Sequence, residues 1–363
     1  MEHTDFYPNT YARTGLFARE LLDATTFRLA MSSTEETLEF QRIKKVLHRY
    51  IVERFPTEDI DGALTINQTH MMGFLIDQTH ILREHVFFKE SGRNIIHVEP
   101  VLCELFANTD VDDVVLTDLK WPYERFYIHY GNASRIAYSI HSVVGAYVHI
   151  HFEQNYKPGR APLNIDLSVV THTDDKHRDR SDSFLARVSN DPIHYISLIA
   201  DPGERAIGAL HWSQNAVLSD KFSCDDDKNW TSVYPNIARL IINTLCYVTA
   251  PGSDIAETRP DDTPARLLKQ SSQTEGGASR RRAISKLDSM GYSTIKICGR
   301  DLQSKYKDAF GGHAGPRPHW RRGHWRHQRH GMGLGLRKLV WIKPVLVAKD
   351  KGDPSQGHIY DLK

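Results

Sequence analysis

The stretch VVGAYVHIHFE, residues 143–153, indicates the fold class of this 363-residue chain, because its β-branched and aromatic residues are typical of a β-strand. Similar short runs lie on both sides of it, separated by turn residues: DVVLTDL (113–119), RFYIHYG (125–131), LNIDLSVV (163–170) and HYISLIAD (194–201). Short strands bounded by turns predict an antiparallel sheet.

Two histidines in the opening stretch, His149 and His151, alternate with apolar residues. Alternate residues of a strand share a face, so both are predicted to point to the same side of the sheet. We interpret them as packed or surface histidines and not as metal ligands.

A charged loop, THTDDKHRDRSD (171–182), follows the strand at 163–170. Read functionally, it offers a metal or acid/base site made from His172, Asp174, Asp175 and His177. A solvated hairpin tip is the favoured interpretation, because exposed tips collect polar residues for solvation alone.

Outward from the predicted sheet, the sequence predicts helices. Residues 1–110 read as a mainly helical region; in SSTEETLEFQRIKKVLHRYIVERFP (32–56), Ser33 and Glu36 form a possible capping box and Pro56 supplies a stop. After the strands, VYPNIARLIINTLCYVTAPGSD (233–254) keeps helical spacing of apolar residues, which predicts a buried helix ending before Pro251. Residues 111–252 are therefore predicted to form the sheet plus this helix.

The last third of the chain divides into two further parts. Residues 253–282 are rich in Pro, Gly, Ser, Thr and charge, which is typical of a mobile linker, with poor order expected around 270–280. Residues 283–363 form a basic and aromatic module with strand character at 292–299 and 336–349, where Pro344 permits only an edge position. The sequence thus predicts an α+β protein: a helical N-terminal part, an antiparallel sheet and a C-terminal basic module packed back on the sheet.

Positive charge is concentrated in one segment of an almost neutral chain. The whole sequence carries 46 Lys and Arg against 45 Asp and Glu, so a strong positive field has to come from local segregation. From Ala309 to Lys349 there are nine Lys or Arg, five His and no Asp or Glu. RPHWRRGHWRHQRHG, residues 317–331, is the centre of this segment.

Arginine and tryptophan interleaved in this way suit single-stranded RNA, because guanidinium groups bind phosphates and indole rings stack on unpaired bases. No cofactor and no metal ligand is expected. The residues predicted to bind RNA or otherwise to function are Arg317, His319, Trp320, Arg321, Arg322, Gly323, His324, Trp325, Arg326 and Arg329.

Other interpretations of the segment remain open. A metal-dependent nuclease would use His319, His324, His327 and His330 with Asp174 or Asp175, although the nearby arginines raise the free energy of placing a cation there. A protein-protein inhibitor would touch no nucleic acid. In a purely structural role, the tryptophans belong to the core, and Arg and His cover acidic surface.

The remaining features of composition point to the cytoplasm of the cell that makes the protein. The four cysteines, Cys103, Cys224, Cys246 and Cys298, are far apart, which indicates neither a disulfide framework nor a thiolate zinc site. The N-terminus lacks a signal-peptide pattern, and no uncharged apolar run approaches the ~20 residues of a membrane span. We expect no contact with a membrane.

The basic segment also resembles a known family. Arg317-Pro318-His319, then Arg321-Arg322-Gly323-His324-Trp325, a glycine-rich turn and the strand LVWIKPVLV (339–347) are similar to the C-terminal signature of the type V-A anti-CRISPR family. Weaker likenesses lie at INTLCYVTAPGSDI (242–255), LKWPYERFYIHYG (119–131) and RRAISKLDSMGYS (281–293).

The resemblance implies a function. Members are proteins of phages and plasmids that recognise the N-terminal peptide of the CRISPR effector nuclease during translation and lower its mRNA, without being established nucleases. The likeness transfers a functional role to the signature residues from Arg317 to Trp325. This chain departs from the signature in two ways: Trp320 replaces an aliphatic residue, and residues 326–330 are more basic. The peptide recognised is therefore expected to belong to a CRISPR effector or to another host protein.

Overall fold

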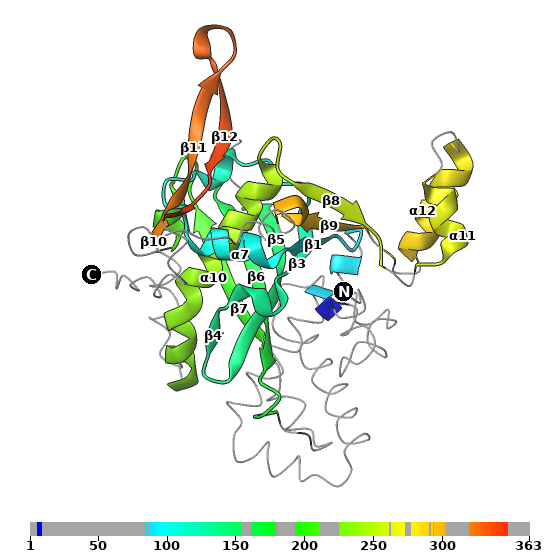
Figure 1. The fold of residues 1–363 in the computed structure, drawn as a ribbon, viewed down its shortest axis with the longest axis horizontal. Coiled ribbons are helices and arrows are strands. Elements are labelled where there is room, and N and C mark those ends of the chain that lie inside the picture. Colours follow the sequence, from blue (N-terminus) through cyan, green and yellow to red (C-terminus); the bar gives the residue numbers. More distant parts are fainter. Residues whose placement is uncertain are drawn as a thin grey trace.

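The fold is described by a computed structural model (Figure 1). The described residues are 6–8, 84–85, 87–89, 91–153, 161–178, 180, 193–210, 225–260, 263–272, 277–289, 292, 294–302 and 319–347. Most of the predicted N-terminal helical region, including the predicted helix at 32–56, lies outside them.

The main sheet has eight strands and is mixed. Its order is β7 (Ile193–Ala200), β6 (Leu163–Thr173), β5 (His141–Phe152), β3 (Arg125–His129), β1 (Ile95–Val98), β9 (Ile295–Cys298) and β8 (Ile255–Thr258), with β4 (Ala137–Tyr138) pairing β5. Neighbours from β3 to β7 run antiparallel, as the sequence predicts. The α+β class is confirmed.

The prediction of a purely antiparallel sheet needs correction at the centre. β1 runs parallel to both β3 and β9, and its sequence IIHV is buried at all four positions. A strand buried on both faces lacks the apolar-polar alternation by which half-buried strands are identified. For that reason β1 was missed within the region predicted as helical. The stretch 113–119 is also not a strand: it forms one isolated bridge at Val115 and the 3₁₀ turn η2 (Leu116–Asp118).

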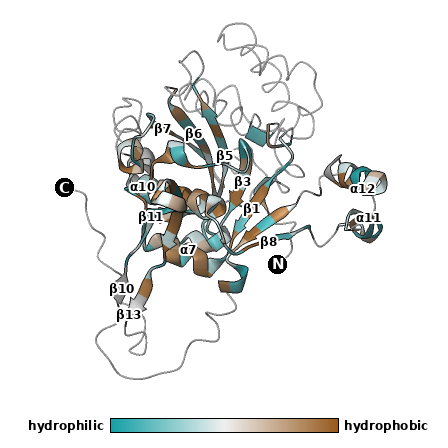
Figure 2. Ribbon diagram, turned by 90° about the horizontal axis from the view of Figure 1, so that it is seen from above, coloured by the Kyte–Doolittle hydropathy of each residue, from teal (hydrophilic) through white to brown (hydrophobic). Residues whose placement is uncertain are grey.

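Two helices cover one face of the sheet. α7 (Pro100–Ala107) follows β1 directly and has Pro100 in its first turn. The backbone N–H that proline lacks would have no partner within the helix at this position. α10 (Asp225–Thr249) ends before Pro251 as predicted, although it begins earlier and contains Pro235. Hydrophobic residues, brown in Figure 2, lie on α7 and on the strands beside it. The buried residues Phe106, Ile150, Leu167, Ile241 and Leu245 belong to the common core.

The segment predicted as a linker carries regular structure. It contains the strand β8, the helix α11 (Ala265–Ser271) and the start of the helix α12 (Gly277–Ser289), and β8 pairs with β9. Residues 273–276 lie outside the described part. Ala283 and Leu287 lie one turn apart on the same face of α12, and both are buried. A polar segment can therefore form a helix when a few apolar residues share one face. Figure 1 shows α11 and α12 as a pair that projects from the body of the protein.

The basic segment forms a hairpin outside the main sheet. β11 (Gly323–His330) and β12 (Leu336–Ile342) run antiparallel, joined by η4 (Met332–Leu334), and β11 adds parallel to the short strand β2 (Thr109–Asp110). β10 (His319–Arg321) and β13 (Val345–Val347) form a separate pair, with Pro344 between β12 and β13. The hairpin therefore contacts the body through β2, whereas β9 of the same C-terminal module joins the main sheet between β1 and β8.

Two further facts concern the cysteines and the helices of the described residues. Cys103, Cys246 and Cys298 are buried free thiols, and burial raises the pKa of Cys103 and Cys298 to about 12. Among the described helices, none is both long enough and apolar enough to cross a membrane.

Candidate nucleic-acid interface

The hairpin of β11 and β12 has two parts, which we call the base (323–325 with 339–342) and the arm (326–338). The base is anchored by Trp325, which is 4% exposed and belongs to the hydrophobic core. Its ring stacks on Trp341, with ring centroids 5.7 Å apart and planes at 16°. Its indole N–H donates to the Oδ1 of Asn243 on α10, at 2.8 Å.

Two further contacts fix the base against α7 and β2. Trp341 packs at 5.6 Å from the ring of Phe106, and its indole N–H donates to Oγ1 of Thr109 at 3.2 Å. Asn243, fully buried, donates its amide to the carbonyl oxygens of Phe106 and Thr109. One buried asparagine thus links α7, β2 and β11 through three hydrogen bonds.

Gly323, transferred as a functional residue from the family signature, has a structural reason to be glycine. A Cβ at this position would lie 2.6 Å from Cδ of Pro344 and 2.8 Å from the carbonyl oxygen of Ile342. The backbone N–H of Gly323 donates to the carbonyl oxygen of Asn108 at 2.9 Å. The strand therefore approaches its neighbours more closely than any side chain permits.

Beyond the base, the arm is exposed and basic on both of its faces. Arg326, Arg329, Arg337 and Lys338 are exposed, and within the described part of the chain none of them makes an ion pair. Arg329 lies directly opposite Arg337 in the strand register. Like charges at such positions repel, so the bare arm carries an unfavourable interaction that a bound anion would relieve.

The tip of the arm is apolar. Met332, Leu334 and Leu336 are 103%, 58% and 60% exposed. The turn depends on Gly333, whose φ of 70° is a conformation that residues with a side chain rarely adopt. Figure 1 shows the hairpin, orange to red, extending well beyond the body. An exposed apolar tip on a basic stalk is a surface that favours contact with another molecule.

The predicted site residues divide among these parts. Arg317 lies outside the described residues, and His319, Trp320 and Arg321 form β10. Arg322, His324, Arg326 and Arg329 are exposed, as binding requires. The ring of Trp325 is buried in the hydrophobic core, and the partly buried Trp341 packs against that core, which favours a structural role for these two tryptophans. A role of the predicted residues in RNA binding stays a prediction.

The histidines of the described hairpin do not converge. His324 and His330 lie six residues apart on β11, which at ~3.4 Å per residue separates them by roughly 20 Å. His327 points to the opposite face of the strand. Asp174 and Asp175 belong to an exposed turn after β6, where Asp174 approaches His177 at 3.7 Å. The nuclease interpretation therefore finds no metal site among the described tail residues.

Sequence reasoning missed part of the basic surface. Arg337 and Lys338 fall on the predicted strand at 336–349 but were not assigned a role, although they face Arg329 and Gln328 across the hairpin.

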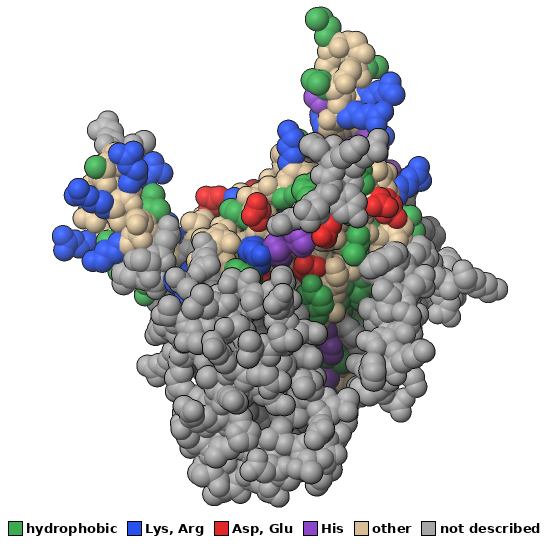
Figure 3. All heavy atoms as spheres, turned by 180° about the vertical axis from the view of Figure 1, so that it is seen from behind, with side chains coloured by type: hydrophobic (Ala, Val, Ile, Leu, Met, Phe, Trp, Pro, Cys, Tyr) green, Lys and Arg blue, Asp and Glu red, His purple; other side chains and the backbone are tan. Residues whose placement is uncertain are grey.

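A second basic surface lies on the projecting pair α11 and α12. Its exposed cations are Arg266, Lys269, Arg280, Arg281, Arg282 and Lys286. Figure 3 shows Lys and Arg (blue) on both projections and acidic side chains (red) on the surface between them.

A cavity of about 360 Å³ lies beside the base of the hairpin. One wall is formed by Lys338 and Trp341 of β12 and by Lys343, which follows it; the other is formed by the turn after α10 and by Asp301 and Leu302. Asp254 in this turn accepts hydrogen bonds from the backbone N–H groups of Asp301 and Leu302 at 2.7 and 3.2 Å. The cavity thus combines an aromatic wall with charges of both signs, next to the basic arm.

Comparison with known proteins places this arrangement in a family. Residues 96–349 match the AcrVA2-like family, described as the anti-CRISPR type V subtype A2 family. Among solved structures, the crystal structure of AcrVA2 is similar over 96% of this chain and 99% of that chain, with 13% sequence identity and a TM-score of 0.46. No curated protein matches the chain. Since the family match spans more than half of the sequence, including the core strands and the basic hairpin, the chain belongs to the AcrVA2-like anti-CRISPR family.

Proposed function

We propose that this protein suppresses the synthesis of a CRISPR effector nuclease, or of another host protein, in the bacterial cytoplasm. It recognises the N-terminal peptide of the target as the peptide leaves a translating ribosome. The basic arm binds the single-stranded RNA nearby, and the mRNA of the target is lowered. Family membership supports the anti-CRISPR part of this proposal.

The observation that carries the RNA-binding part is the arm itself. Its arginines are exposed and lack carboxylate partners among the described residues, and Arg329 lies opposite Arg337 across the hairpin. The buried base fixes the backbone of the strands that carry these guanidinium groups, so binding phosphates does not require that backbone to become ordered. Contacts of this kind are electrostatic and independent of base sequence.

The peptide is proposed to lie in the cavity beside β12. Trp341 supplies an apolar wall for an uncharged side chain, and Asp254, Asp301, Lys338 and Lys343 supply polar partners for a peptide backbone or terminus. The cavity adjoins the arm through Lys338, so a peptide and an RNA bound together would meet at the hairpin.

RNA binding is tested by changing three arginines of the arm together, Arg326, Arg329 and Arg337, to Ala. Each lost phosphate contact lowers the salt dependence of binding to single strands by about 0.7 in the slope of log K against log salt, so the slope should fall by about 2. The matched control changes Arg280, Arg281 and Arg282 on α12, which removes the same charge from another exposed surface. Equal losses in both triple variants would contradict a specific role for the arm.

Peptide recognition is tested by photo-crosslinking in cells that synthesise the target. A photoreactive amino acid at Lys343, on the rim of the cavity, should capture the nascent N-terminal peptide, whereas the same residue at Lys286 on α12 should not. Replacing the N-terminal codons of the target with unrelated ones should abolish both capture and the fall in mRNA. Capture that persists with unrelated codons would contradict recognition of the peptide.

A further inference from the structure

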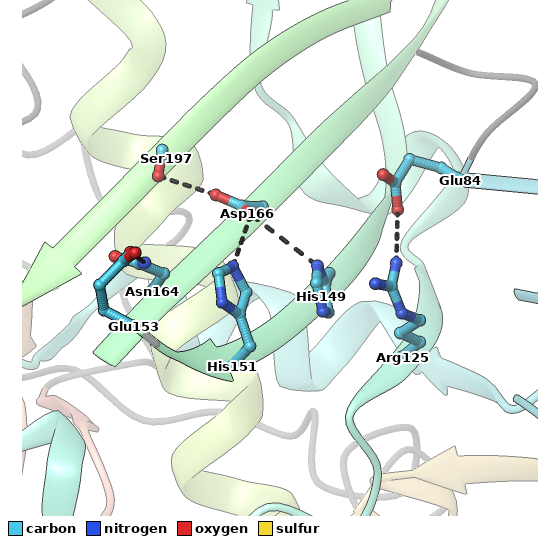
Figure 4. Close-up of polar contacts among 8 residues, drawn as sticks. All are labelled: Glu84, Arg125, His149, His151, Glu153, Asn164, Asp166 and Ser197. Carbon is cyan, nitrogen blue, oxygen red and sulfur yellow. Dashed lines mark hydrogen bonds and ion pairs between the residues drawn. The ribbon is translucent and has the colours of Figure 1, made fainter. Parts of the chain in front are cut away.

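A cluster of potential metal ligands lies on the main sheet, far in sequence from the basic hairpin. It consists of His149 and His151 on β5 and Asp166 on β6, and one ligand atom from each lies within 4.8 Å of the others. The Oδ2 atom of Asp166 is 3.0 Å from Nε2 of His151 and 3.8 Å from Nδ1 of His149. Figure 4 shows both imidazoles turned toward this carboxylate. Within the described residues, it is the one group of three or more such side chains.

The strand register explains why these residues meet. His149 lies directly opposite Asp166, and His151 is the next residue of β5 on the same face. The two imidazole rings stack with centroids 4.4 Å apart, which confirms that they share a face of the sheet. The opposite face of β5 and β6 carries the core residues Ile150 and Leu167. The ligand positions are therefore fixed by regular, well-packed strands and not by a loop.

The carboxylate of Asp166 is also oriented from its other side. Ser197, directly opposite Asp166 on β7, donates its hydroxyl to Oδ1 at 2.8 Å. This contact leaves Oδ2 facing the histidines. Hydrogen bonds of this kind, which orient a ligand without touching the metal, accompany most protein metal sites.

Arg125, the cation opposite His149 on the neighbouring strand, has an acidic and an aromatic neighbour of its own. Arg125 on β3 lies opposite His149 in the register, and its guanidinium approaches Glu84 at 3.7 Å and covers the ring of Phe87 at 4.0 Å. The site thus differs from the histidines of the hairpin, which lie among arginines that disfavour a bound cation.

We propose that His149, His151 and Asp166 bind a divalent transition metal, with zinc the best fit. Two imidazoles and one carboxylate are a donor set that zinc accepts, and ligand atoms around a tetrahedral ion with bonds of about 2.0 to 2.1 Å lie roughly 3.3 Å apart. The distances of 3.0 and 3.8 Å from Asp166 bracket this value. Three protein ligands leave a fourth position for water or for an external ligand. The side chains of His149, His151 and Asp166 are 18%, 35% and 17% exposed, so solvent reaches the site. This inference does not depend on the proposed RNA or peptide binding.

The test uses the untagged full-length protein and zinc alone. Equilibrium dialysis followed by elemental analysis should give one zinc per chain. The variants His151→Ala and Asp166→Asn should each weaken zinc binding at least tenfold, and Ser197→Ala should weaken it by about 10- to 100-fold, as orienting residues do. Cobalt substituted for zinc should show the visible absorption of a tetrahedral ion, which a plain hydrogen-bonded pair would not produce.

The control is His177→Ala, which removes a comparable pair, His177 and Asp174 at 3.7 Å in an exposed turn. Among the described residues, no third ligand joins this pair. This variant should leave zinc binding unchanged. Asp166→Asn keeps the shape of the side chain, and a melting curve checks that each variant folds. Absence of zinc from the folded wild-type protein would overturn the proposal. So would zinc that the variants at positions 151 and 166 retain with unchanged affinity.

Discussion

The two ends of the strand β11 lie in opposite environments: two of the three residues at the base, GHW (323–325), are buried, whereas none of the five in the arm, RHQRH (326–330), is buried. At the base, Trp325 lies in the core and donates a hydrogen bond to Asn243. Arg326, the next residue, and Arg329 are exposed and lack carboxylate partners in the described structure. The base holds the hairpin in place and the arm presents charge, so one short segment has two separable roles.

This difference teaches how a basic aromatic segment should be interpreted. Tryptophan and arginine in alternation suggest stacking on bases, but Trp325 is used for the fold. An indole ring is the largest apolar group that a strand can bury, and its N–H needs a partner that a buried asparagine supplies. The variants below separate stability, which should depend on the base and the core, from binding, which should depend on the arm.

The largest expected effect is at Trp325. Replacing it with Ala removes a buried ring and leaves the amide of Asn243 without its donor, which should lower the free energy of unfolding by about 3 to 5 kcal/mol. Denaturant unfolding measures this loss. Met332→Ala at the fully exposed tip is the control and should stay within about 0.5 kcal/mol of wild type. Similar values for the two variants would remove the distinction between base and arm.

Acid should weaken the core next. Burial lowers the pKa of His85 and of His129 to about 3, and at His129 the charge of His97 adds to this effect. Both histidines are therefore neutral in the folded protein at neutral pH. Between pH 6.5 and 3 the unfolded chain binds more protons, and stability therefore falls as the pH falls. Each histidine contributes up to about 1.4 kcal/mol per pH unit in this window.

Unfolding measured at several pH values from 7.5 to 5 tests this effect. His129→Asn should reduce the slope of stability against pH, whatever it does to stability at neutral pH. A variant that keeps the full wild-type slope would show that His129 is not a buried neutral group.

A smaller loss is expected at Asn243. Asn243→Ala removes a partner from the Trp325 indole and from two backbone carbonyl groups, which should cost about 1 to 3 kcal/mol. Combining it with Trp325→Phe, which lacks the N–H donor, should give less than the sum of the two single losses. Strict additivity would mean that the hydrogen bond between them contributes nothing.

The smallest expected effect has the opposite sign. Arg329→Gln removes the repulsion with Arg337 across the hairpin and should stabilise the protein by roughly 0.2 to 1 kcal/mol while it weakens RNA binding. Arg205→Gln is the comparison, because Arg205 pairs with Asp113 at 2.7 Å and has no such repulsion to lose. A stabilised variant with unchanged RNA affinity would show that the arm charges serve something other than RNA.

Much of the sheet could be predicted from the sequence. The strands β3, β5, β6 and β7 follow runs of β-branched and aromatic residues, and α10 follows helical spacing up to Pro251. β1 could not be found in this way, because a four-residue strand buried on both faces shows no alternation. The short strand β2 has no signal of its own, since it exists only where β11 pairs with it.

The candidate sites were predictable in part. Local charge identified the exposed arginines of the arm, but not which tryptophan would be buried, because burial depends on Asn243, which lies 82 residues earlier in the chain. The alternation of His149 and His151 predicted a shared face and was interpreted as ordinary packing. Asp166 completes the cluster only through the register of β5 with β6, and that register is not evident in either strand alone.

The pairing of β9 with β1 inside the sheet has a consequence for how the protein is made. β9 (Ile295–Cys298) pairs β1 (Ile95–Val98), about two hundred residues earlier, and both strands lie inside the sheet. Pairings so distant in sequence form slowly, and during synthesis β1 has to wait for β9 to leave the ribosome. The hairpin is made later still. Until then the edge of β1 is open to other chains, so we expect a chaperone requirement that ends when β9 closes the sheet.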